Sequence, residues 1–215
     1  MPEFKFCGLT RAEDVAHAVT LGAHYLGFIL APSPRQRSIA QFRALVASLG
    51  ATPATRVGVF VSPTTDELAR AVEALSLGAV QVHGTLPMPV AELRAEIGAS
   101  VWCVMGVSGA VVEPGADLLA ADADVLLFDT SVAGRTGGSG RAFDWAGVRA
   151  SLEAVRGRAR IALAGGLGSH NVADAIQALA PDIVDVSSGI ERTPGVKDHG
   201  MMTAFASAVR GVVPA

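Results

Sequence analysis

The chain has very little lysine. Of its 17 basic side chains only Lys5 and Lys197 are lysines, so a mechanism that requires a Schiff-base lysine has at most two candidates. The net charge is −3 at pH 7, and no run of basic residues interleaved with aromatic residues is present. These features give no electrostatic reason to expect nucleic acid as a partner. A small-molecule substrate is the expected ligand.

The chain also lacks an apolar run long enough to cross a membrane. The longest window without a charged side chain, residues 15–34, is interrupted by His17, Gly22 and Pro32. Residues 1–5 do not combine a basic region with a long apolar core, as a secretory signal would. We therefore expect no membrane partner and a cytoplasmic location.

Cysteine is scarce as well, and neither Cys7 nor Cys103 lies in a CxxC or histidine-rich pattern. Two cysteines in a chain of this length predict neither a disulfide framework nor a metal site. Each could simply be a small buried hydrophobic residue. Lys5, however, precedes Cys7 by two residues in an extended stretch, so both side chains point to the same side. A nearby ammonium favours the thiolate that a general base requires, which makes Cys7 a candidate base.

Aromatic residues make up 5% and charged residues 17% of the chain, whereas half of the residues are hydrophobic. This composition is typical of a buried parallel sheet covered by helices. Eight short apolar runs alternate with segments of helical periodicity, at residues 4–8, 25–30, 57–61, 79–83, 101–107, 125–129, 161–164 and 183–186. This alternation predicts an α/β fold, a (β/α)8 TIM barrel formed by one domain that spans residues 1–215. A doubly wound open sheet remains the alternative, because periodicity does not show closure.

Local signals also predict where some helices begin and which face they bury. Residues 10–13 and 64–67 both have the pattern of a capping box, with a threonine followed three residues later by a glutamate. Apolar residues at 172, 175, 176 and 179 have the spacing of one helix face. We expect helices to follow both capping patterns and that face to pack on the sheet.

The last two predicted strands end in glycine-containing loops, with Gly165 and Gly166 in the first and Ser188 and Gly189 in the second. Glycine lets the backbone approach an anion closely, and exposed amides complement its charge. Such glycines can also serve only to turn the chain. In barrels, however, the loops after strands seven and eight form the usual phosphate site. The two loops together therefore predict phosphate binding.

Asp129 ends the sixth apolar run. Burial beside the four apolar residues before it would raise the pKa of its carboxyl and help it hold a proton, as a general acid must. The alternative is a carboxylate that caps the next turn or pairs with an arginine. The glycine-rich segment 137–140 that follows is interpreted as a mobile cover over the site.

Other candidates lie in the loop after the second strand and on the fourth strand. Arg35 could bind a carboxylate through two parallel hydrogen bonds, although it could equally be a solvated loop residue. Gln81 and His83 share one strand face. His83 is predicted to contact the ligand without a chemical role, and a structural role is an equal alternative.

The ordered motifs of the whole chain resemble those of the phosphoribosylanthranilate isomerase family of tryptophan biosynthesis. Any one motif is weak, but the ordered set is highly specific. The motifs are KFCGLT at 5–10, SPR at 33–35, VGVFV at 57–61, QVHG at 81–84, LFDT at 127–130, GGSG at 137–140, FDW at 143–145, LAGGL at 163–167, DVSSGIE at 185–191 and PGVKD at 194–198.

The resemblance implies a (β/α)8 barrel that catalyses an Amadori rearrangement, an intramolecular aldose–ketose isomerisation, with no metal and no organic cofactor. Asp129 would protonate the furanose ring oxygen of N-(5-phosphoribosyl)anthranilate as the general acid, and Cys7 would remove the proton from C2 as the general base. The remaining assignments concern binding: Lys5, Arg35, His83 and Asp185 for the substrate, and Gly165, Gly166, Ser188 and Gly189 for its phosphate. Because the residues after Arg35 depart from the family pattern, Arg37 remains an alternative partner for the anthranilate carboxylate.

Two other functions remain in competition. An isomerase of the histidine pathway, or one that accepts both substrates, would perform the same rearrangement, but its expected base on the first strand is an aspartate rather than Cys7. A catalytically silent barrel that binds a phosphorylated metabolite would need the glycine loops and neither Cys7 nor Asp129. The sequence is compatible with a monomer and with a homodimer, because an exposed apolar patch cannot be located without coordinates.

Overall fold

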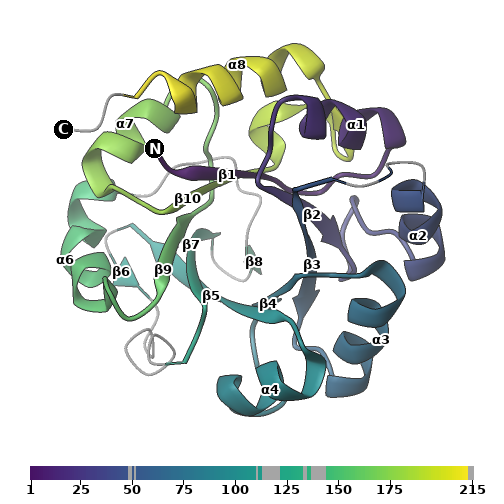
Figure 1. The fold of residues 1–215 in the computed structure, drawn as a ribbon. Coiled ribbons are helices and arrows are strands. Elements are labelled where there is room, and N and C mark those ends of the chain that lie inside the picture. Colours follow the sequence, from purple (N-terminus) through teal and green to yellow (C-terminus); the bar gives the residue numbers. More distant parts are fainter. Residues whose placement is uncertain are drawn as a thin grey trace.

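The computed structural model describes residues 1–47, 50, 52–109, 111–112, 122–132, 135–136 and 144–212. Eight parallel strands form a closed ring with helices around its outside (Figure 1). The strands of the ring are β1 (Glu3–Phe6), β2 (Tyr25–Ile29), β3 (Thr55–Val61), β4 (Ala79–His83), β5 (Ser100–Ser108), β7 (Val125–Val132), β9 (Arg160–Leu163) and β10 (Ile183–Val186). The helices are α1 (Ala12–Thr20), α2 (Ile39–Ala47), α3 (Thr65–Leu75), α4 (Val90–Ile97), α6 (Trp145–Val155), α7 (Val172–Leu179) and α8 (His199–Arg210).

Strand pairing closes the ring. β1 pairs in parallel with both β2 and β10, so the first and last strands of the ring are neighbours. β5 pairs in parallel with β7, and the remaining neighbours follow the order of the chain. The (β/α)8 prediction is therefore confirmed, and the open-sheet alternative is wrong. Each of the eight predicted apolar runs corresponds to one strand of the ring.

Short additional elements follow three strands of the ring, β5, β7 and β10. β6 (Val111–Val112) pairs antiparallel with β5, and β8 (Arg135–Thr136) pairs antiparallel with β7. After β10 the chain makes a short 3-10 helix, η1 (Ser188–Ile190), and a hairpin of β11 (Glu191–Thr193) and β12 (Val196–Lys197). This hairpin lies between the last parallel strand and α8, and it contributes to the site described below.

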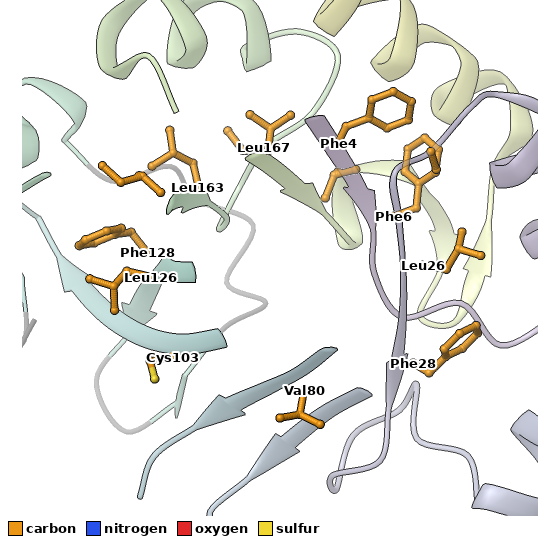
Figure 2. Close-up of a cluster of buried hydrophobic side chains, with 14 of the residues drawn as sticks. Phe4, Phe6, Leu26, Phe28, Val80, Cys103, Leu126, Phe128, Leu163 and Leu167 are labelled. Atoms are coloured by element: carbon orange, nitrogen blue, oxygen red, sulfur yellow. The ribbon is translucent and has the colours of Figure 1, made fainter. Parts of the chain in front are cut away.

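The alternation of side chains along the strands produces two buried apolar layers. In β7, Leu126 and Phe128 belong to the layer between the strands and the helices, whereas Val125 and Leu127 belong to the layer inside the ring. Figure 2 shows part of the outer layer, with Phe4, Phe6 and Phe28 on one side and Leu126 and Phe128 on the other. Fully burying a side chain of this size contributes roughly 1.5–3 kcal/mol, so these buried residues contribute strongly to stability.

Local helix signals are only partly confirmed. Thr64 caps α3 in a full capping box with Glu67, as predicted. The predicted capping box at Thr10 is wrong, because α1 begins after Arg11 and the Thr10 hydroxyl donates instead to the backbone carbonyl of Gly195. The hairpin supplied a partner for Thr10 that the local pattern could not include. In α7 the predicted face is buried, with Val172, Ala175, Ile176 and Leu179 all packed inward.

Candidate active site

The carboxyl ends of the eight strands lie at one end of the ring, called here the barrel mouth. Cys7 follows β1 directly, and Asp129 lies in the part of β7 that approaches this end. Asp129 has the strand parity of the inward-pointing Leu127, so its side chain points into the ring. Cys7 has the parity of Lys5, whose ammonium contacts other inward-pointing residues. Both predicted catalytic side chains are therefore buried inside the same end of the barrel.

Gly27 on β2 makes room for the candidate base. A Cβ atom added at Gly27 would lie 2.9 Å from Cys7 Sγ and 3.1 Å from Lys5 Cε. A larger residue would displace Cys7, since real Cβ contacts are essentially never shorter than 3.0 Å, and would crowd the Lys5 side chain. The neighbouring strand is therefore shaped around Cys7 and Lys5.

Lys5 organises the polar layer beneath the mouth. Its Nζ donates to Asp185 Oδ2 at 2.8 Å and to Gln81 Oε1 at 2.8 Å, and it lies 5.8 Å from the centre of the Trp102 ring. The side chain is fully buried. Burial lowers the pKa of Lys5, but the charges of Asp185 and Cys7 raise it, and it ends above its ordinary value. Lys5 therefore stays protonated below the mouth and holds Asp185, a predicted substrate-binding residue.

His83 is the third member of this layer. Its Nε2 lies 3.1 Å from Gln81 Nε2, and Gln81 Oε1 already accepts from Lys5. Burial, followed by the charge of Lys5, lowers the pKa of His83 to about 4, so the imidazole is neutral at pH 7. Since Gln81 donates to Nε2, the proton of the neutral ring is assigned to Nδ1. His83 thus offers one N–H donor, which fits the predicted contact role.

The pKa of Cys7 is not shifted in the direction that its neighbour in sequence suggests. Burial raises the pKa of the thiol most strongly, the charge of Lys5 lowers it, and the charge of Asp185 raises it again. The result lies above the ordinary value, because the Lys5 ammonium is also paired with Asp185. At neutral pH the thiolate is therefore a minor species that increases as the pH rises.

We expect this shift to govern alkylation of the cysteines. The rate at which iodoacetamide labels Cys7 should increase about tenfold per pH unit from pH 7 to 9, because the thiolate is the reactive form and its pKa is raised. Cys103 is buried in the outer layer, and its pKa is raised to about 12, so it should remain unlabelled throughout. Peptide mass spectrometry distinguishes the two sites. Rapid labelling of Cys7 at pH 7 that does not change with pH would contradict the raised pKa.

Arg35 is held by a carboxylate that local sequence patterns did not identify. Its Nε donates to Glu191 Oε1 at 2.8 Å and its Nη2 to Glu191 Oε2 at 2.7 Å. The aliphatic part of the Arg35 side chain packs directly against Gly8, since a Cβ at Gly8 would lie 2.6 Å from Arg35 Cδ. This places Arg35 beside Cys7 at the mouth. Arg37 instead lines a surface pocket with Val61, so the geometry favours Arg35 as the arginine of the site.

Glu191 and Lys197 are site residues that sequence reasoning did not assign to a role. The hairpin register places them opposite each other, and Lys197 Nζ donates to Glu191 Oε1 at 2.8 Å. Lys197 Nζ also donates to the backbone carbonyl of Ser187 at 3.1 Å. Both residues occur in motifs that carry the family resemblance. No local pattern could connect them with Arg35, because 156 residues separate Glu191 from it.

The two predicted phosphate loops lie against each other. Gly165 and Gly166 both have positive φ, at 79° and 67°, which L side chains rarely adopt. A Cβ at Gly189 would lie only 2.0 Å from the carbonyl oxygen of Leu167, so the second loop packs on the first only because residue 189 is glycine. In the ring, β9 and β10 are the two strands between β7 and β1. A phosphate bound there would lie between Asp129 and Cys7.

Two buried polar atoms at the mouth have no hydrogen-bond partner in the described part of the chain, Asp185 Oδ1 and Ser187 Oγ. A buried polar atom without a partner is costly, and such atoms are commonly satisfied by a ligand or by water. Both atoms belong to the end of β10, beside the second glycine loop. The site therefore offers polar groups for a hydroxylated ligand at the place where Asp185 was predicted to bind substrate.

The predicted cover at 137–140 lies outside the described residues. Within the described ranges, no three His, Cys, Asp or Glu side chains come together as a metal site would require. The same part of the chain contains no helix with both the length and the apolar character of a membrane span.

The fold and this arrangement define a (β/α)8-barrel protein with a thiol, a carboxylate, an arginine and paired glycine loops at the carboxyl ends of its strands. The family model described as N-(5'phosphoribosyl)anthranilate (PRA) isomerase matches residues 4–208. The chain belongs to this family.

Individual relatives agree with this assignment. The N-(5'-phosphoribosyl)anthranilate isomerase of Ralstonia pickettii is 42% identical over 219 residues, covering 96% of this chain and 91% of that protein. The isomerase of Streptococcus mutans is 40% identical, covering 98% of this chain and all of that protein. The crystal structure of phosphoribosyl anthranilate isomerase from Thermotoga maritima superimposes with a TM-score of 0.83 at 34% identity, covering 98% of this chain and 100% of that one.

A further solved structure of a phosphoribosyl anthranilate isomerase contains reduced 1-(o-carboxyphenylamino)-1-deoxyribulose 5-phosphate. It superimposes with a TM-score of 0.80 at 32% identity, and it covers 98% of this chain and 100% of that one. The ligand of that protein carries both a phosphate and an aromatic carboxylate.

Proposed function

We propose that this chain is a phosphoribosylanthranilate isomerase of tryptophan biosynthesis, with Asp129 as general acid and Cys7 as general base. Membership of the family supports the activity. The observation that carries the role assignment is the burial of both side chains at one end of the closed barrel, with the two glycine loops on the strands between them. An acid and a base held on either side of an anchored sugar phosphate can act on different atoms of the same ring.

The first step opens the ribose ring. The Asp129 carboxyl gives its proton to the furanose oxygen, and the bond between that oxygen and C1 breaks as the nitrogen lone pair forms a C=N bond. The product is a cationic Schiff base. Its positive charge lies next to C2 and makes the C2 proton more acidic.

The second step removes that proton. The Cys7 thiolate takes the proton from C2, the electron pair forms a C1–C2 double bond, and the Schiff-base nitrogen is neutralised as an enolamine. Tautomerisation then places a proton on C1 and removes one from the C2 hydroxyl, which yields the 1-deoxyribulose 5-phosphate product. Asp129 is left ionised and Cys7 protonated, so one proton must return to Asp129, directly or through solvent, before the next turnover.

The binding residues complete the proposal. The amides of Gly165, Gly166, Ser188 and Gly189 hold the phosphate, because Gly165 and Gly166 have the positive φ that side chains rarely adopt and Gly189 lets the second loop pack on the first. Asp185 and His83 meet the sugar hydroxyls, which supplies a partner for Asp185 Oδ1. Arg35 holds the anthranilate carboxylate. Lys5, fully buried beneath the mouth, acts by holding Asp185.

The test is turnover of N-(5-phosphoribosyl)anthranilate by the purified protein, followed through the loss of anthranilate-type fluorescence. We expect saturable turnover that is competitively inhibited by reduced 1-(o-carboxyphenylamino)-1-deoxyribulose 5-phosphate. Binding of that inhibitor without any turnover of the substrate would instead identify a silent metabolite-binding barrel. Parallel assays with the histidine-pathway substrate determine whether the mouth accepts a second ligand.

The oligomeric state remains a prediction of monomer or homodimer. A solved structure concerns monomers generated from the dimeric phosphoribosylanthranilate isomerase of Thermotoga maritima, which is 34% identical to this chain. Analytical ultracentrifugation distinguishes the two states.

A further inference from the structure

Arg35 uses only part of its guanidinium for the contact with Glu191. Nε and Nη2, which form one edge of the planar group, donate to the two carboxylate oxygens at 2.8 and 2.7 Å. The adjacent edge consists of Nη1 and the second hydrogen of Nη2, and the described residues place no partner on Nη1. A guanidinium can accept a second carboxylate on this edge through two parallel hydrogen bonds. Glu191 therefore fixes the plane of Arg35 and leaves one binding edge open.

Glu191 is itself firmly held. Its side chain is 4% exposed, and Oε1 accepts from Lys197 Nζ at 2.8 Å and from the backbone N–H of Gly195 at 3.1 Å. Lys197 is fully buried and is anchored in turn by the carbonyl of Ser187 and, through its backbone N–H, by Asp14 on α1. The hairpin therefore fixes Glu191, and through Glu191 it fixes the Arg35 side chain in the distant loop after β2.

The charges explain why both Glu191 and Lys197 are needed to hold Arg35. Glu191 alone would place a negative charge beside the site of an incoming carboxylate and repel it. Lys197 donates to Glu191 Oε1, the oxygen that also accepts from Arg35 Nε, and offsets that charge. Burial raises the pKa of Glu191, but Arg35 and Lys197 lower it below its usual value, so the carboxylate is ionised at neutral pH.

We propose that Glu191, supported by Lys197, is a positioning residue for carboxylate recognition: it fixes Arg35 beside Cys7 with its open edge toward the carboxylate of the substrate. The inference rests on the proposed function, because it assumes a ligand that joins a carboxylate-bearing ring to a sugar phosphate. Glu191 does not touch the substrate. It acts by removing the rotational freedom that Arg35 would otherwise lose on binding.

The test compares two stable ligands that differ in one group. One is reduced 1-(o-carboxyphenylamino)-1-deoxyribulose 5-phosphate, and the other is the same molecule without the carboxylate. Dissociation constants are measured by titration calorimetry for the wild type and Glu191→Gln. We expect Glu191→Gln to weaken binding of the carboxylated ligand roughly tenfold, as loss of one well-placed charged contact would, and to change the other less than twofold. In an Arg35→Met background, Glu191→Gln should have no further effect on either ligand.

Glu153→Gln provides a matched control, because Glu153 pairs with Arg156 on the exposed surface of α6. It should leave both affinities unchanged. Where Glu191→Gln does not fold, Glu191→Asp keeps the charge, withdraws the carboxylate from Arg35 and should produce the same selective loss. Equal weakening of both ligands, or no weakening, overturns the positioning role. A wild type that binds both ligands without turning over substrate overturns the proposed function and leaves this comparison valid.

Discussion

Replacing Asp129 by asparagine is expected to lower kcat about 10³-fold while KM changes only a few-fold. Removal of a general acid typically costs 10²- to 10⁴-fold, since the amide is almost isosteric with the carboxyl and cannot transfer a proton to the ring oxygen. Asp129 points into the ring at the end of an apolar stretch and is 8% exposed, so its replacement alters the mouth directly. Steady-state fluorescence kinetics give both constants.

Asp182→Asn is the matched control for this experiment. Asp182 lies just before β10 at the opposite end of the barrel, where its carboxylate accepts from the backbone N–H of Ile161. An asparagine can still accept that hydrogen bond, so kcat should stay within about twofold of the wild type. If Asp129→Asn retains near-normal kcat while remaining folded, the acid has been assigned to the wrong residue.

Replacing Cys7 by alanine is expected to lower kcat by a similar factor of about 10³, because the C2 proton then has no base within reach. Cys103→Ala removes the other buried thiol, which lies in the outer layer, and should leave kcat unchanged even if it lowers thermal stability. Near-normal turnover by Cys7→Ala would disprove the role of Cys7.

Cys7→Asp distinguishes a lost base from a merely disturbed site. A carboxylate can accept the C2 proton, so this variant should be at least tenfold more active than Cys7→Ala. Its pH dependence should also differ from that of the wild type. Because the pKa of Cys7 is raised, the thiolate fraction and kcat/KM of the wild type should fall as the pH decreases below 8. Cys7→Asp should keep its kcat/KM over that range, since a carboxylate remains ionised to lower pH.

His83 and Lys5, in the polar layer beneath the mouth, are coupled to each other. Gln81 links Lys5 to His83, so the ammonium that holds Asp185 also contributes to the low pKa of the imidazole. Breaking a buried pair of this kind by removing one partner typically costs about 3–5 kcal/mol of stability. Kinetic tests of this layer therefore need conservative changes with folding monitored in parallel.

The sequence by itself determined the eight strands and the strand ends at which the catalytic candidates lie. Strand runs and side-chain alternation are local properties, so Cys7 was predicted to share a side with Lys5 and Asp129 to end an apolar strand, whereas the structure showed which face of each strand points into the ring. The positions of the last two strands in the chain order likewise indicated that the glycine loops after them form the phosphate site, since parallel strands of a barrel share one functional end.

The tertiary structure alone decided how the charges are paired. Local reasoning predicted that Lys5 would lower the pKa of Cys7. Asp185, which lies 180 residues from Lys5, pairs with its ammonium and raises the pKa of Cys7. Burial of the thiol raises this pKa further and outweighs the effect of Lys5. Glu191 meets Arg35 only because the hairpin after β10 returns to the mouth. Burial and long-range pairing depend on closure of the whole ring, which no window of sequence contains.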